Sequence, residues 1–76
     1  MPEQELAGKI TSWMQSVIPA GQFEHTIPEI SAGVEERNRG KLEVALFSLR
    51  RSEILGNRLR GKTYYHFLES LRSSPV

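Results

Sequence analysis

The sequence has no cysteine and no aspartate among its 76 residues. Without cysteine it has no disulfide bond, thiolate zinc site or cysteine nucleophile. The two histidines, His25 and His66, have no nucleophile or carboxylate at a recognised spacing. A metal site formed by both histidines and Glu24 would require their segments to pair, so buried or exposed histidines are the simpler interpretation. We therefore expect no enzymatic activity, no metal and no cofactor.

Long apolar segments are also missing. No stretch approaches the roughly 18 apolar residues of a transmembrane helix, and the N-terminal MPEQELAGK lacks the basic start and apolar run of a secretory signal. We expect a soluble, cytoplasmic protein that does not bind membranes. A chain this short builds one modest core. We expect a single domain over residues 1–70 and a frayed tail over residues 71–76, where Leu71 is almost the only apolar side chain.

The formal net charge of +1 hides a separation of charge along the chain. Residues 1–36 contain one lysine and six glutamates, a net charge of −5. Residues 37–62 contain eight lysines and arginines and two glutamates, a net charge of +6. If the basic segment folds onto one face, that face attracts polyanions.

The first predicted helix covers PEQELAGKITSWMQSVI. Its apolar side chains recur at helical spacing and form one stripe, made of Leu6, Ile10, Trp13 and Val17. Pro2 suits the first turn, and Pro19 and Gly21 end the helix. A membrane-surface role for this helix is the alternative, but its polar face lacks the excess of basic residues that anionic lipid attracts. We therefore expect the stripe to pack in the core.

The segment GQFEH is a weak candidate for a short strand, with Phe23 pointing inward. A second helix starts at Thr26, because Thr26 and Glu29 have the spacing of a capping box and Pro28 is tolerated in a first turn. Gly33 is the expected end of this helix. A polar connector, EERNRG, follows, and its Asn38 is a candidate cap for the next helix.

The third predicted helix, KLEVALFSLRRSEIL, is the most strongly patterned. Its buried face consists of Leu42, Ala45, Leu46 and Leu49. After it, the period changes and TYYHFL is rich in residues that favour strands. We expect two short strands, roughly Glu53–Leu55 and Thr63–Phe67, joined by a flexible basic loop. Strand alternation places one of Tyr64 and Tyr65 in the core.

Residues 5–68 resemble the winged helix-turn-helix family of DNA-binding domains. The segments that carry the resemblance are TIPEISAGV as the first helix of the motif, LEVALFSLRRSEIL as the recognition helix, and GNRLRGKTYYHF as the wing. The connector between Gly33 and Leu42 is about three residues longer than the family's usual turn. The resemblance implies an α+β fold, a three-helix winged helix-turn-helix with a C-terminal β-hairpin wing. It is typical of small bacterial, phage or plasmid transcriptional regulators.

The implied function is sequence-specific binding of double-stranded DNA, which would associate the protein with the nucleoid. The recognition helix would enter the major groove and the basic wing would follow the phosphate backbone or enter the minor groove. The base-contact candidates are Asn38, Arg39, Lys41 and Val44. The candidates for backbone or wing contacts are Arg37, Arg51, Arg58, Arg60 and Lys62. Because one winged helix reads few base pairs, a homodimer or a second DNA-binding protein is the expected partner.

Each of these residues also has a structural interpretation. Asn38 is equally suited to capping a helix, and Arg37, Arg39 and Lys41 suit a solvated connector. Arg50 and Arg51 suit compensation of the helix dipole. Exposed Val44 and Phe47 would instead favour a protein interface, so the alternative function is a winged-helix interaction module for another regulator or a polymerase component. Recognition of double-stranded RNA is a third hypothesis, because a basic surface itself carries no sequence information.

Overall fold

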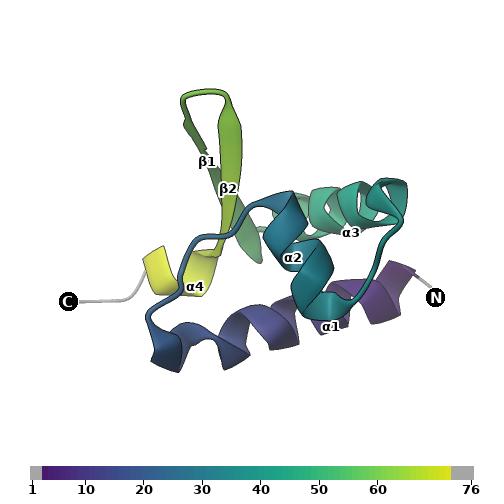
Figure 1. Ribbon diagram of the computed structural model, residues 1–76, viewed down its shortest axis with the longest axis horizontal. Helices are drawn as coiled ribbons and strands as arrows, with labels where there is room; N and C mark the ends of the chain where they lie inside the picture. Colours follow the sequence, from purple (N-terminus) through teal and green to yellow (C-terminus); the bar gives the residue numbers. More distant parts are fainter. Residues whose placement is uncertain (1–2, 73–76) are drawn as a thin grey trace.

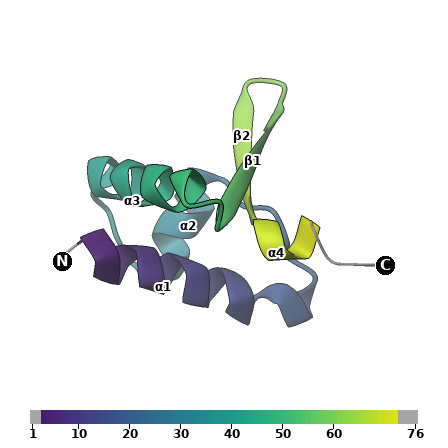
Figure 2. The ribbon, with the colours of Figure 1, turned by 180° about the vertical axis from the view of Figure 1, so that it is seen from behind.

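The structure is a computed structural model that describes residues 3–72. It is an α+β fold in which helices precede a two-stranded antiparallel hairpin (Figures 1 and 2). The elements in chain order are α1 (Glu3–Ser16), the 3-10 helix η1 (Ile18–Ala20), α2 (Ile27–Val34), α3 (Arg39–Arg51), β1 (Leu55–Arg60), β2 (Thr63–Leu68) and α4 (Glu69–Arg72). Both views show α2 and α3 packed on one side of α1, with the hairpin projecting away from α1.

The core lies between α1, α2, α3 and the base of the hairpin. Its buried side chains are Leu6, Ile10, Met14, Ile30, Val34, Leu42, Ala45, Leu46, Leu49, Leu55 and Leu68. The predicted buried face of the third helix is confirmed in full. The stripe predicted for the first helix is correct for Leu6 and Ile10, but Met14 takes the third buried position while Trp13 and Val17 are only partly buried. The expected role of Pro2 lies outside the described residues.

The α2 helix begins as predicted and ends later. Thr26 and Glu29 form the capping box, in which the Thr26 N–H donates to Glu29 Oε1 at 2.8 Å. Gly33 does not end the helix, because α2 continues to Val34 and Glu35 adopts the left-handed conformation with φ +56°. Gly33 is instead the place where the Trp13 ring meets α2, since a Cβ there would lie 2.1 Å from Trp13 Cε2.

The expected long connector between the two motif helices is wrong. Asn38 caps α3, so the helix starts at Arg39, three residues before Leu42, and only residues 35–38 separate it from α2. A connector of this length matches the tight turn, about 3–4 residues, of a helix-turn-helix motif. Both predicted ends of the connector, Gly33 and Leu42, lie inside helices, because α2 continues to Val34 and α3 already starts at Arg39.

The expected basic loop of the hairpin is largely strand. The ladder runs from Leu55 opposite Leu68 to Arg60 opposite Thr63, and only Gly61 and Lys62 form the turn. Gly61 has φ +63°, which suits the two-residue turns that close tight hairpins. Cross-strand pairing with β2 thus outweighs the weak strand preference of glycine and asparagine in β1.

The segment between η1 and α2 forms one isolated bridge to the hairpin. The backbones of His25 and His66 pair in an antiparallel bridge, so the short strand expected here is reduced to a single position. The inward orientation expected for Phe23 is wrong: its side chain is 49% exposed, and His25 is the buried residue, packed against the Trp13 ring. Strand alternation would place positions 23 and 25 on the same face, but only His25 is paired with the hairpin, so no strand extends back to orient Phe23.

The end of the described chain is helical. α4 runs from Glu69 to Arg72, and Leu71 packs against the core, so the predicted frayed tail does not begin at residue 71. Residues 73–76 of that tail lie outside the described residues. None of the helices between residues 3 and 72 has the length and apolar content that crossing a bilayer requires.

Candidate nucleic-acid interface

The first turn of α3 presents three of the predicted base-contact residues. Asn38 Oδ1 accepts a hydrogen bond from the Lys41 N–H at 3.1 Å, and the Asn38 N–H donates to Glu36 Oε2 at 3.1 Å. The capping interpretation of Asn38 is therefore confirmed. Its amide nitrogen remains as a donor on an exposed side chain. The same residue can cap the helix and offer a donor group to a ligand.

Arg39 and Lys41 differ in their surroundings. Arg39 Nε lies 3.3 Å from Glu43 Oε1, and both side chains are largely exposed. An exposed pair of this kind contributes little to stability, so Arg39 can exchange Glu43 for another anion at small cost. Lys41 is exposed, and no carboxylate of residues 3–72 forms an ion pair with it.

The outward face of α3 is apolar at its centre. Val44 and Phe47 are 52% and 57% exposed, and Gly40 precedes them on the same face at helical spacing. Arg51 ends the stripe, about 18 Å along the helix axis from Arg39. Arg51 therefore lies at the opposite end of α3 from the base-contact candidates, beyond the reach of the groups around Asn38.

The two arginines of β1 lie on the face of the hairpin that is opposite the groove beside α3. Arg58 and Arg60 alternate with Asn57 and Leu59 along β1, so the two arginines share one face of the hairpin. Both guanidinium groups pair with Glu24, at 3.4 Å for Arg58 and 3.2 Å for Arg60. Arg60 also lies over the Tyr65 ring, with its Cζ 5.5 Å from the ring centre. The flexible arginines expected at the wing tip are thus held against a carboxylate.

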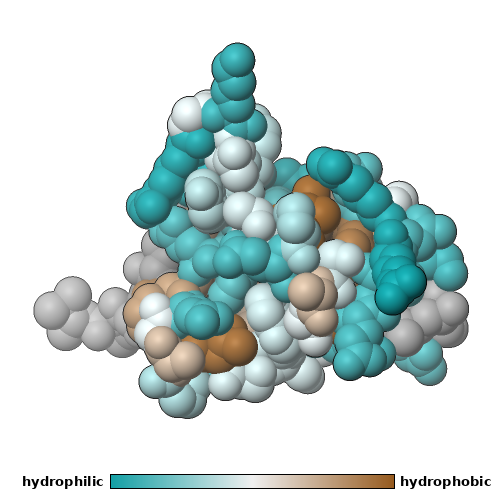
Figure 3. Space-filling model, in the orientation of Figure 1, coloured by the Kyte–Doolittle hydropathy of each residue, from teal (hydrophilic) through white to brown (hydrophobic). Residues whose placement is uncertain are grey.

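Lys62 is the basic side chain of the turn itself. It is exposed, as is Arg37 in the connector before α3. Neither residue forms an ion pair within residues 3–72. Figure 3 shows, from one side of the molecule, hydrophilic surface along the hairpin and at the end of α3 away from the hairpin, with brown apolar surface between them.

A groove of about 760 Å³ lies between α3 and the hairpin. Its wall on α3 includes Val44, Leu46 and Phe47, and its wall on the hairpin includes Tyr64. Two polar groups in it have buried atoms without hydrogen-bond partners, Arg50 through Nε and His66 through both ring nitrogens. Side chains alternate between the two faces of a strand, so the sequence TYYHFL could have predicted that Tyr64 and His66 share one face of β2.

Both histidines are buried and favour their neutral forms. Burial lowers the pKa of His66, and the charge of Arg50 lowers it further. Burial also lowers the pKa of His25, although Glu29 and a hydrogen bond to the Gln22 backbone oppose that shift. The pairing that a metal site would have required does form, yet among residues 3–72 no three histidine or acidic side chains come together in a way that holds a metal ion.

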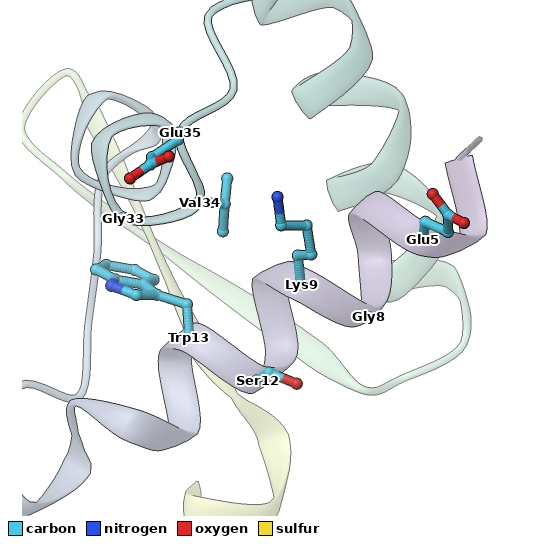
Figure 4. Close-up of a pocket in the computed structure, with 8 residues that line it drawn as sticks. All are labelled: Glu5, Gly8, Lys9, Ser12, Trp13, Gly33, Val34 and Glu35. Carbon is cyan, nitrogen blue, oxygen red and sulfur yellow. The ribbon is translucent and has the colours of Figure 1, made fainter. Parts of the chain in front are cut away.

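A second hollow, of about 700 Å³, lies between α1 and α2 (Figure 4). The Trp13 ring lies beside Gly33 at one end, and the Lys9 side chain points from α1 toward Val34. None of the described residues that line it has a buried polar atom without a partner. It therefore offers less to a polar ligand than the groove beside α3.

The structure brings together only part of the predicted interface. Asn38, Arg39 and Lys41 gather at the start of α3, whereas Arg58 and Arg60 lie with Glu24 on the face of the hairpin opposite Asn57 and His66. Glu24 was not predicted as their counter-charge, because no local pattern links position 24 to β1.

No protein-family model matches the sequence, and a search of the curated proteins finds no match.

Proposed function

We propose that this chain is a winged helix-turn-helix protein that binds double-stranded DNA and regulates transcription. The order of elements supports this proposal: a helix, a one-residue bridge, the α2–α3 pair with its short connector, and a hairpin. In such proteins the second motif helix reads the major groove and the hairpin contacts the adjacent backbone or minor groove. Here these parts are α3 and the turn at Gly61 and Lys62.

The observation that carries the proposal is the distribution of unpaired positive charge. Five cations of the basic segment have no ion-pair partner among residues 3–72: Arg37, Lys41, Arg50, Arg51 and Lys62. Arg37 and Lys41 flank the start of α3, and Lys62 is in the hairpin turn. Cations that are free of counter-charges can release the counterions of a phosphate backbone at no cost in broken ion pairs.

Sequence readout would come from the start of α3. Arg39 can donate two hydrogen bonds to guanine once it leaves Glu43, and the Val44 methyl groups can contact thymine. Lys41 adds a donor for guanine or phosphate. A homodimer, or a second DNA-binding protein beside this one, would supply the further base pairs that one recognition helix does not reach. The cytoplasm, with the nucleoid when bound to DNA, is the location that this function requires.

Fluorescence anisotropy tests the proposal. The purified protein would be titrated into a pool of labelled random duplex DNA at several salt concentrations, and the retained fraction would then be sequenced. Enrichment of one motif supports a sequence-reading regulator, and a palindromic motif supports a dimer. Absence of binding even at low salt contradicts the proposal. A parallel titration with duplex RNA separates DNA binding from recognition of A-form shape.

A further inference from the structure

Exposed apolar side chains border the groove between α3 and the hairpin, whereas nucleic-acid interfaces are more polar than protein–protein interfaces. Four large apolar side chains on its walls and rim are each about half exposed: Val44 52%, Phe47 57%, Leu59 54% and Tyr64 53%. Leu59 and Tyr64 are opposite each other in the hairpin ladder, on the same face as Asn57 and His66. The apolar surface therefore continues from α3 up the hairpin, and contiguous apolar surface of this kind marks an interaction site.

The floor of the groove contains polar groups that the fold leaves without partners. His66 is 4% exposed, and neither of its ring nitrogens has a hydrogen-bond partner. Arg50 Nε is buried and also has none. Buried polar groups in folded proteins are nearly always hydrogen-bonded, and each exception calls for an explanation. An acceptor atom of a ligand in the groove could accept from Arg50 Nε or from the single N–H of the neutral His66 ring.

The charge of the groove defines which acceptor fits. Arg50 forms no ion pair within residues 3–72, and its guanidinium is close enough to His66 to lower the pKa of that residue further, beyond the effect of burial. Glu43 is the acidic residue on the groove wall, but Arg39 already pairs with it. The uncompensated charge in the groove is thus positive, and a carboxylate complements it better than a neutral acceptor.

We propose that this groove docks a peptide segment of another protein, one that places a large apolar side chain next to an aspartate or glutamate. The apolar side chain would lie between Phe47 and Tyr64, and the carboxylate would accept hydrogen bonds from Arg50 and His66. A peptide fits better than a small molecule because the apolar surface extends beyond the groove to Leu59. Apolar anchors combined with one charged contact are a common mode of peptide recognition.

This inference does not depend on DNA binding. If both proposals hold, the peptide would cover Val44 and Phe47 on the outward face of α3 and would compete with DNA. The peptide would then act as an antagonist of DNA binding, and the anisotropy of a bound duplex would fall when the peptide is added. The docking site itself is tested without DNA.

The test is a selection from a display library of random short peptides on the immobilised protein. We expect enriched peptides to share an acidic residue beside an aromatic or large aliphatic residue. A labelled peptide from the selection would then be titrated against the parent, Arg50→Gln, Phe47→Ser and the control Arg51→Gln. Arg51 is the neighbour of Arg50 on α3 but lies outside the groove. We expect affinity to fall by about tenfold or more for Arg50→Gln and Phe47→Ser, and to stay unchanged for Arg51→Gln.

A second measurement separates the docking contact from a general loss of structure. The selected peptide with its acid changed to the amide should bind the parent about tenfold more weakly but should lose little further affinity on Arg50→Gln, because the two changes remove the same contact. Phe47 is exposed, so Phe47→Ser should retain the parent's circular dichroism and unfolding midpoint. Failure to enrich any peptide, enrichment of peptides without acids, or equal binding to all variants would overturn the proposal.

Discussion

His25 and His66 exchange two backbone hydrogen bonds, of 2.9 and 2.7 Å, which join the segment before α2 to the hairpin. Their side chains are only 2% and 4% exposed. The bridge therefore fixes the hairpin to the helical core at a point where two titratable rings are buried together with it.

We expect the protein to lose stability as the pH falls below about 6.5, the ordinary histidine pKa. Burial holds the pKa of both histidines below that value in the folded protein. The unfolded chain consequently binds more protons in this range, and the free energy of unfolding decreases as the pH falls. Urea unfolding between pH 8 and pH 5.5, above the range where glutamates titrate, measures the effect. A free energy of unfolding that stays constant over this range would show that the two rings are not held in their neutral forms.

Gly33→Ala should destabilise the fold by about 1–3 kcal/mol, as overpacking does elsewhere. The added Cβ would lie 2.1 Å from Trp13 Cε2, so the indole or the α1–α2 packing would have to move. Gly8→Ala on α1 is the matched control, because nothing lies within 4 Å of its added Cβ. That control should gain about 0.5–1 kcal/mol from helix propensity. Thermal and urea unfolding of both variants measure the two changes, and equal stabilities would contradict the close contact.

Asn38→Ala should cost about 1 kcal/mol of stability, because it removes the cap that accepts from the Lys41 N–H. Asn38→Ser keeps a capping oxygen and should retain most of that stability. The pair of variants also separates the two roles of Asn38. If the Ser variant binds DNA like the parent, capping alone accounts for the residue, whereas a changed base preference at near-parent stability identifies a base contact.

Glu24→Gln should strengthen DNA binding and increase its salt dependence. The change removes the carboxylate that holds Arg58 and Arg60, and each arginine that then reaches a phosphate adds about 0.9 to the magnitude of the slope of log K against log salt.

In the parent, Arg58→Ala with Arg60→Ala should change the slope less than the single change Lys62→Ala. A parent whose slope falls most when the two arginines are removed would show that Glu24 does not restrain them.

The parts of the fold that were predicted from the sequence depend on local signals. The Thr26–Glu29 capping box, the Asn38 cap and the buried period of α3 each involve residues within two helical turns, where spacing determines contact. The burial of Met14 in place of Trp13 required knowledge of how α1 meets α2, since the Trp13 ring is directed toward Gly33.

The candidate site was predictable in composition but not in arrangement. The Asn38 cap predicted which residues form the first turn of α3. The arginines of β1 were instead predicted to lie in a flexible loop, whereas they lie in a strand. Their ion pairs with Glu24 join positions that are distant in sequence, and only the register of the hairpin determines which face they occupy. The unpartnered nitrogens of His66 likewise depend on tertiary packing and have no sequence signature.

The most direct test of the proposed function is the map of amide chemical shifts when duplex DNA is added to the ¹⁵N-labelled protein at low salt. We expect the largest changes at residues 37–44 and at the turn around Gly61 and Lys62, with α1 nearly unaffected. Changes centred on α1, or no change at all, would contradict the proposal that α3 and the hairpin turn bind DNA.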